Sequence, residues 1–204
     1  MQPPACSMLG PPAGRAGMNV NTDNWPKAHR LTVGDFRRVA EAGVLAPDDR
    51  VELIHGEIVD MPPIGSRHAA AVTVLAKRLT FAAGDTVDVR VQAPVTLAPD
   101  SEPQPGIALV KPRSDAYRTT HPAAQDILLL IEVGEATLRF DRERKSRLYA
   151  EHRIPEYWVV DLIGGRVFFY SDPNDGSYTQ RSSTGGGTRR LESLNLEIDL
   201  SGLF

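Results

Sequence analysis

Glu132 and Lys145 are the residues of this chain whose placement most directly suggests chemistry. Glu132 lies near the end of an apolar run over residues 128–133, which Gly134 closes and which is typical of a strand buried on both faces. A buried carboxylate is unfavourable unless it is paired or binds a cation. Lys145 follows thirteen residues later in a charge-rich segment. A helix that folds back over the end of the strand would bring the two side chains together.

A carboxylate and a lysine in this arrangement suit phosphodiester hydrolysis. Carboxylates hold Mg²⁺ through oxygen ligands, and the ion polarises the phosphate and activates water. A lysine can orient that water or neutralise charge that develops in the transition state. A structural alternative stays open, because Glu132 could instead be a satisfied carboxylate paired with Arg139 or Lys145. Lys145 also belongs to a run of basic residues, which is typical of a solvated helix face with ion pairs.

The elements that must position these residues follow from apolar periodicity and turn residues. Thr32 and Asp35 have the spacing of a capping box. We expect helices over residues 33–42, 68–83 and 137–151. We expect strands over residues 51–61 (two strands or one kinked strand), 87–97, 107–110, 127–133, 155–162 and 166–171. This alternation predicts an α/β domain with a mixed central β-sheet, flanked by helices and extended by antiparallel hairpins.

Composition limits the class of protein. The 204 residues suffice for one domain, which we expect over residues 31–204, after a disordered extension over residues 1–30. The net charge of −3 gives no global electrostatic case for nucleic acid, so a local basic surface would have to supply that attraction. Cys6 is the only cysteine, which excludes an internal disulfide and a cysteine-cluster zinc site and fits a reducing cytoplasm. No apolar run is long enough to span a membrane.

Several segments carry a resemblance to a known family, and their order and spacing together are fairly specific. They are VELIHGEIV (51–59), SRH (66–68), QAPV (92–95), EPQPGI (102–107), LIEV (130–133), DRERK (141–145), and Tyr149 with IPEYWVVD (154–161). With these segments the chain resembles the bacterial Uma-two family of restriction endonucleases, within the PD-(D/E)XK nuclease superfamily. The resemblance covers nearly all of residues 31–204.

The resemblance implies a restriction-endonuclease-like core, a divalent metal ion and particular site residues. The ion would be Mg²⁺ or Mn²⁺, at a metal site formed by Glu132, Val133 and Gly106. The catalytic residues would be Glu132, with Lys145 on the following helix and Glu57 as an acid near the site.

Gly106 departs from the superfamily pattern. The proline-aspartate pair of the superfamily falls at Pro105 and Gly106, and a glycine offers no side-chain oxygen. Asp100 and Glu102 lie upstream in a proline-rich loop and would have to swing in. We therefore expect weak metal binding. His68 resembles a residue at the start of the helix beside the site, although a histidine at such a position more often makes only local hydrogen bonds.

Three functions remain in view. The first is a metal-dependent DNA endonuclease, impaired by Gly106 and acting as a homodimer. The second is a catalytically inactive nuclease fold that binds nucleic acid or a protein. The third is a dimerising structural protein with no nucleic-acid role. We expect the late hairpins, at residues 166–170 and 178–181, to offer apolar and aromatic surface for dimerisation.

Overall fold

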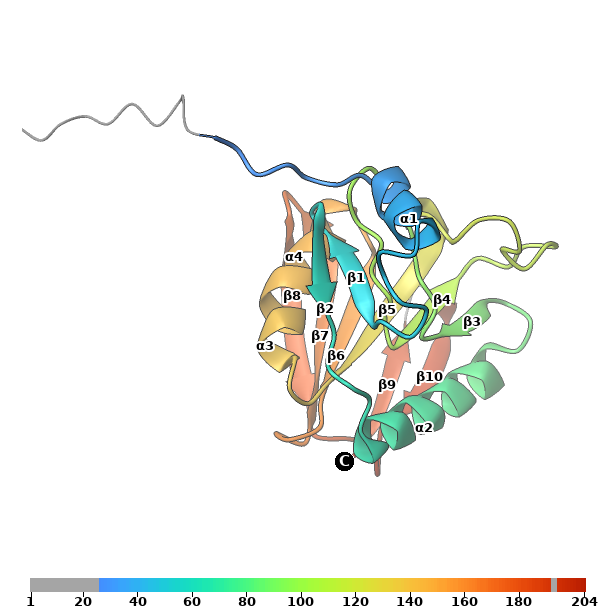
Figure 1. Cartoon of the computed structure of the whole chain (residues 1–204). Helices are drawn as coiled ribbons and strands as arrows, with labels where there is room; N and C mark the ends of the chain where they lie inside the picture. The colour runs from blue at the N-terminus through green and yellow to red at the C-terminus, as the bar shows by residue number, and fades with distance from the viewer. Residues whose placement is uncertain (1–25, 192–193) are drawn as a thin grey trace, which may run out of the picture.

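The computed structural model describes residues 26–191 and 194–204, so Cys6 and most of the expected N-terminal extension lie outside the described residues. Its centre is a six-stranded sheet in the order β3-β4-β5-β6-β7-β8 (Figure 1). The strands are β3 (Asp88–Val91), β4 (Ile107–Val110), β5 (Ile127–Gly134), β6 (Glu156–Asp161), β7 (Arg166–Asn174) and β8 (Ser177–Thr184). β5 runs parallel to β6, and the other neighbouring pairs are antiparallel. The sheet is therefore mixed.

Helices and two small hairpins flank this sheet, which confirms the predicted fold class. The hairpin strands are β1 (Val51–Ile54) with β2 (Glu57–Asp60), and β9 (Thr188–Leu191) with β10 (Leu196–Asp199). The helices are α1 (Val33–Glu41), α2 (Ser66–Ala83), α3 (Leu138–Phe140) and α4 (Ser146–Glu151), and a 3₁₀ turn spans Ala124–Asp126. The predicted capping box is present, since Thr32 and Asp35 exchange side-chain and backbone hydrogen bonds. No helix of the described residues is both long and apolar enough to cross a bilayer.

Alternation along β5 directs its side chains to two different layers. Leu129 and Ile131 pack in one cluster with Leu75 and Leu79 of α2, and residues of β9 and β10 join them. Leu130 packs in the other cluster, with Tyr149 of α4. Glu132 lies two residues beyond Leu130, so its side chain faces the layer that contains α4.

The helical segment after β5 is interrupted by a π turn at Asp141–Lys145, between α3 and α4. The backbone N–H of Ser146 donates to the Asp141 carbonyl five residues earlier, and the Tyr157 hydroxyl donates to the same oxygen at 2.9 Å. The single helix expected over residues 137–151 is thus helical throughout, with one wider turn. Such turns occur often at functional sites.

Two sequence expectations were wrong. The strand expected over residues 87–97 ends at Val91, because Gln92 adopts a positive φ of 46° that a strand cannot contain. The late hairpins do not present their aromatic side chains outward. Tyr170 and Tyr178 are both buried, because they pack in the core against Tyr157.

Candidate functional site

A buried charged cluster surrounds Glu132. The Lys145 ammonium donates to Glu132 Oε1 at 2.9 Å, and the Tyr149 hydroxyl donates to the same oxygen at 2.8 Å. Lys145 Nζ also lies 3.0 Å from Glu52 Oε1 and 2.8 Å from Glu52 Oε2. Lys145 and Tyr149 are fully buried, and the two glutamates nearly so. One ammonium therefore bridges two carboxylates inside the domain.

Three separate elements bring this cluster together. β5 supplies Glu132, and the π turn and α4 supply Lys145 and Tyr149 from the helical segment that covers the same face of the sheet. β1 supplies Glu52. The backbone N–H of Glu102 donates to the Leu53 carbonyl at 2.8 Å and so ties the β1–β2 hairpin to the loop before β4.

The electrostatics of the cluster shift the pKa values of three of its groups. Burial alone would lower the pKa of Lys145, but the charges of Glu132, Glu52 and Asp141 outweigh it and raise that pKa, so the ammonium keeps its proton. Burial raises the pKa of Glu52, and the neighbouring Lys145 charge opposes the rise. Burial also raises the pKa of Tyr149, so its hydroxyl stays protonated and able to donate.

Asp141 is a further buried acid beside this cluster. Its Oδ2 accepts a hydrogen bond from Thr137 Oγ1 at 2.7 Å, while its Oδ1 has no partner among the residues that the structure describes. Burial, with the charge of Glu132 adding to it, raises the pKa of Asp141 to about 7. The sequence placed Asp141 in the segment DRERK that carries the family resemblance, but Asp141 was not named as a site residue. Its spacing of four residues from Lys145 was the signal that could have identified it.

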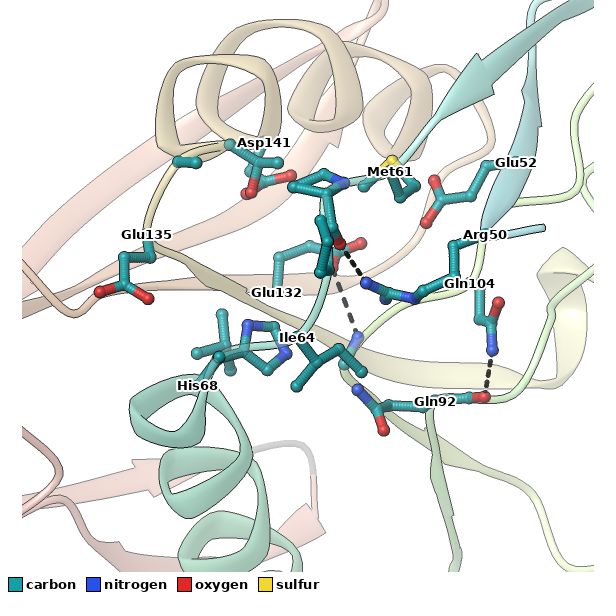
Figure 2. Close-up of a pocket in the computed structure, with 17 residues that line it drawn as sticks. Arg50, Glu52, Met61, Ile64, His68, Gln92, Gln104, Glu132, Glu135 and Asp141 are labelled. Carbon is teal, nitrogen blue, oxygen red and sulfur yellow. Dashed lines mark hydrogen bonds between the residues drawn. The ribbon is translucent and has the colours of Figure 1, made fainter. Parts of the chain in front are cut away.

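These groups border a pocket of about 180 Å³ (Figure 2). Glu132 and Gly106 lie at its floor, where Glu132 Oε2 is 3.4 Å from the Gly106 backbone N–H. Figure 2 shows Asp141 on the helical side and Gln92 with Gln104 on the opposite side. The remaining lining residues come mainly from the segments around β1, the β2–α2 connection and the end of β5. They are Arg50, Glu52, Met61, Pro62, Pro63, Ile64, Gly65, His68, Val133, Glu135, Ala136 and Thr137.

Comparison with known proteins gives this site a family context. The family Uma2, described as "Putative restriction endonuclease", matches residues 33–202. The chain belongs to the Uma2 family. A crystal structure of an Anabaena variabilis ATCC 29413 protein, described as a "putative nuclease belonging to DUF820", matches this Uma2 chain with a TM-score of 0.66. The two share 15% sequence identity over 85% of this chain and 97% of that chain, a likeness that shows the fold. No curated protein matches the chain.

The residues proposed from sequence occupy different places in this Uma2 structure. Glu132, Val133 and Gly106 all line the pocket, and Lys145 lies directly behind Glu132. Glu57 does not line the pocket. It is 40% exposed on β2 and pairs with Arg30 and Arg144. The hairpin instead places Glu52 in the cluster, and the part played by Glu57 in any reaction stays a prediction.

The other residues named from sequence also divide between the pocket and the surrounding structure. His68 lines the pocket at the start of α2, and its burial lowers its pKa. Asp100 and Glu102 do not line it. Glu102 pairs with Arg37 and accepts from Thr96 Oγ1 at 2.9 Å. The upstream acids therefore do not replace the carboxylate that is missing at position 106.

The side chains of the pocket do not form a ready site for a divalent metal ion. Among residues 26–191 and 194–204, no group of three or more His, Cys, Asp or Glu side chains is arranged to hold a metal ion. Glu132 Oε1 is already bound by Lys145 and Tyr149, which leaves Oε2 as its oxygen toward Gly106. Gly106 contributes no side chain. The residues present do not fit a tightly held Mg²⁺, which prefers a complete octahedral shell of oxygen ligands.

Proposed function

We propose that this chain is a DNA endonuclease of the PD-(D/E)XK type whose metal-dependent hydrolysis is impaired by Gly106. One observation supports the proposal above the others. Glu132, held by Lys145, faces the pocket floor directly opposite the backbone of Gly106. The residues that we propose as the acid and the lysine of such a site are therefore in contact, whereas Gly106 has only a hydrogen atom where a second carboxylate would stand.

The chain's own residues would prepare Glu132 for a substrate. Lys145 and Tyr149 both donate to Oε1 and fix the carboxylate in one orientation, with Oε2 turned toward Gly106. Glu52 holds the ammonium from its other side. In active nucleases of this kind, a divalent ion supplies Lewis-acid polarisation of the phosphate. Among the described residues of this chain, the donor set lacks the second carboxylate that would hold such an ion.

The substitution Gly106→Asp tests the proposal. Gly106 lacks a positive φ, but a Cβ there would lie 3.1 Å from the Ile131 carbonyl oxygen, so the backbone must shift by a few tenths of an ångström. We expect the unmodified chain to bind Mn²⁺ weakly and to nick plasmid DNA slowly or not at all. Gly106→Asp should tighten Mn²⁺ binding in calorimetric titration and increase nicking with Mg²⁺.

Gly106→Asn is the matched control, because it adds the same volume without the charge. It should gain neither Mn²⁺ affinity nor nicking. The proposal is falsified if the unmodified chain cleaves DNA robustly with Mg²⁺ and the Asp variant adds nothing.

A second candidate is a nuclease fold that binds nucleic acid or a protein without catalysis. The observation that favours it is the Lys145 bridge, which holds Glu132 and Glu52 together and offsets part of their charge without any metal ion. It would be preferred if Gly106→Asp binds Mn²⁺ but still leaves DNA intact.

We also propose that the protein is a cytoplasmic homodimer, since cleavage of both strands of a duplex suits two sites related by two-fold symmetry. Light scattering at high protein concentration should give the mass of two chains. A mass of one chain at all concentrations would contradict the dimer.

A further inference from the structure

Gln92 occupies an unusual backbone position at the edge of the pocket. It directly follows β3 and has a φ of 46°, in the left-handed region that residues other than glycine rarely adopt. Its backbone N–H donates to the Gly106 carbonyl at 3.1 Å, and its carbonyl accepts from Gln104 Nε2 at 2.5 Å. Two contacts from the segment before β4 therefore hold the backbone of Gln92 beside the floor of the pocket.

This conformation is unfavourable in a non-glycine residue and persists only where the surroundings enforce it. At Gln92 those surroundings are the two backbone hydrogen bonds with Gly106 and Gln104, which leave its side chain lining the pocket.

The Gln92 amide has no fold-stabilising partner. Among the described residues, no hydrogen bond joins its side chain to another group, whereas the neighbouring Arg50 guanidinium donates to the Pro62 carbonyl. Figure 2 shows the Gln92 side chain extending toward Ile64. It is half-buried, so a ligand in the pocket can reach it.

We infer that the Gln92 side-chain amide binds the phosphodiester backbone of a nucleic acid strand whose phosphate enters the pocket. This inference rests on the proposed function, because it specifies how the same pocket holds its substrate. The Nε2 group offers two N–H donors for phosphate oxygens. Contacts of this kind fix the position of a strand and do not read its sequence.

The charge of the pocket explains why a neutral donor serves here. Glu132, Glu52 and Asp141 make the floor acidic, and the Lys145 charge is fully buried behind them. An anionic phosphate therefore finds its donors on the wall of the pocket, where Arg50 also lines it but donates to the Pro62 carbonyl. Gln92 supplies one beside Gly106, at the point where the wall meets the floor.

The substitution Gln92→Gly separates a binding role from a structural one. Glycine tolerates the positive φ and keeps both backbone hydrogen bonds, so the melting temperature should stay nearly unchanged. The control is Ala116→Gly, at another position of positive φ (50°), in a loop that does not line the pocket. Each variant removes only the side chain of a residue whose backbone has the left-handed conformation.

The measurement is fluorescence anisotropy with a short fluorescein-labelled DNA oligonucleotide in EDTA, single-stranded in one arm and duplex in the other. We expect Gln92→Gly to weaken binding about tenfold, as for one hydrogen bond to a charged group. Ala116→Gly should bind as the unmodified chain does. The arm with the lower Kd identifies which form of the phosphodiester backbone the pocket accepts.

Failures of the two ideas can be told apart. If the unmodified chain binds neither oligonucleotide, the proposed function fails and the inference fails with it. If the unmodified chain binds and Gln92→Gly binds equally well, only the inference fails. A large drop in melting temperature that accompanies the lost affinity would show that the side chain holds the fold, which also overturns the inference.

Discussion

Replacing Lys145 with methionine should severely destabilise the protein at neutral pH. Methionine has a similar length and fills the buried site, but it lacks the ammonium that bridges Glu132 and Glu52. Both carboxylates would then remain buried without their counter-charge. Removing one partner of a buried ion pair costs ~3–5 kcal/mol. Total stabilities of ~5–15 kcal/mol are typical, so the loss would be a large part of the whole.

The two carboxylates should not contribute equally to this loss. Glu132 keeps the Tyr149 hydroxyl as a donor at 2.8 Å, whereas Lys145 is the only side chain that donates to Glu52 among the described residues. Adding Glu52→Gln to Lys145→Met should therefore recover more stability than adding Glu132→Gln. The loss should also shrink as the pH falls from about 7 to about 4, because the unpaired carboxylates can then take up protons while folded.

Urea unfolding followed by far-UV circular dichroism and by tryptophan fluorescence gives the free energies, with the fully buried Trp158 as one reporter. If Lys145→Met is too unstable to purify, the double variants supply the comparison. A loss below about 1 kcal/mol that does not change with pH would refute the reasoning. It would mean that the cluster accommodates its carboxylates without Lys145.

Three further predictions concern single residues of the site and its surroundings. Asp141→Asn should stabilise the protein at about pH 8 and have little effect near pH 4. The raised pKa of about 7 means that the folded protein loses stability as the pH rises through it, by up to ~4 kcal/mol in unfolding measurements. Glu57→Gln should leave nicking by the Gly106→Asp variant unchanged, because Glu57 pairs with arginines outside the pocket; lost nicking would restore its catalytic role. Gly106→Asp itself should lower stability by ~1 kcal/mol in urea unfolding, because its Cβ approaches the Ile131 carbonyl at 3.1 Å.

The positions of Glu132 and Lys145 were accessible from the sequence because each follows a local rule. A continuous apolar run predicts a buried strand, and a charge-rich segment directly after it predicts the returning helix. The six-stranded sheet confirms both, with Glu132 near the end of β5 and Lys145 on the segment that follows. Local periodicity was enough to predict their contact, because β5 directs Glu132 toward the face of the sheet that the helical segment with Lys145 covers.

The choice between Glu52 and Glu57 was not accessible in the same way. The two lie on paired strands of one hairpin, where Glu52 faces Val59 and Glu57 faces Ile54 across the ladder. Which strand presents its acid to the cluster depends on how the whole hairpin packs, and long-range contacts such as that between Leu53 and Glu102 decide this. The apolar residues on both sides of Glu52 in the sequence were a weak sign that this glutamate would be buried.

The π turn at Asp141–Lys145 means that the helix carries one residue more than a regular α-helix of the same length would need. Deleting Glu143, which is exposed and bonds only to Arg139 among the described residues, would let hydrogen bonds of the ordinary i to i−4 kind close through the segment. The shortened chain should form a more regular helix, yet Asp141 and Lys145 would stand three residues apart and no longer four. A shorter turn would thus make the helix more regular but would change the spacing of two buried charged residues. A single-residue deletion there should therefore be harmful, although it removes only a surface side chain.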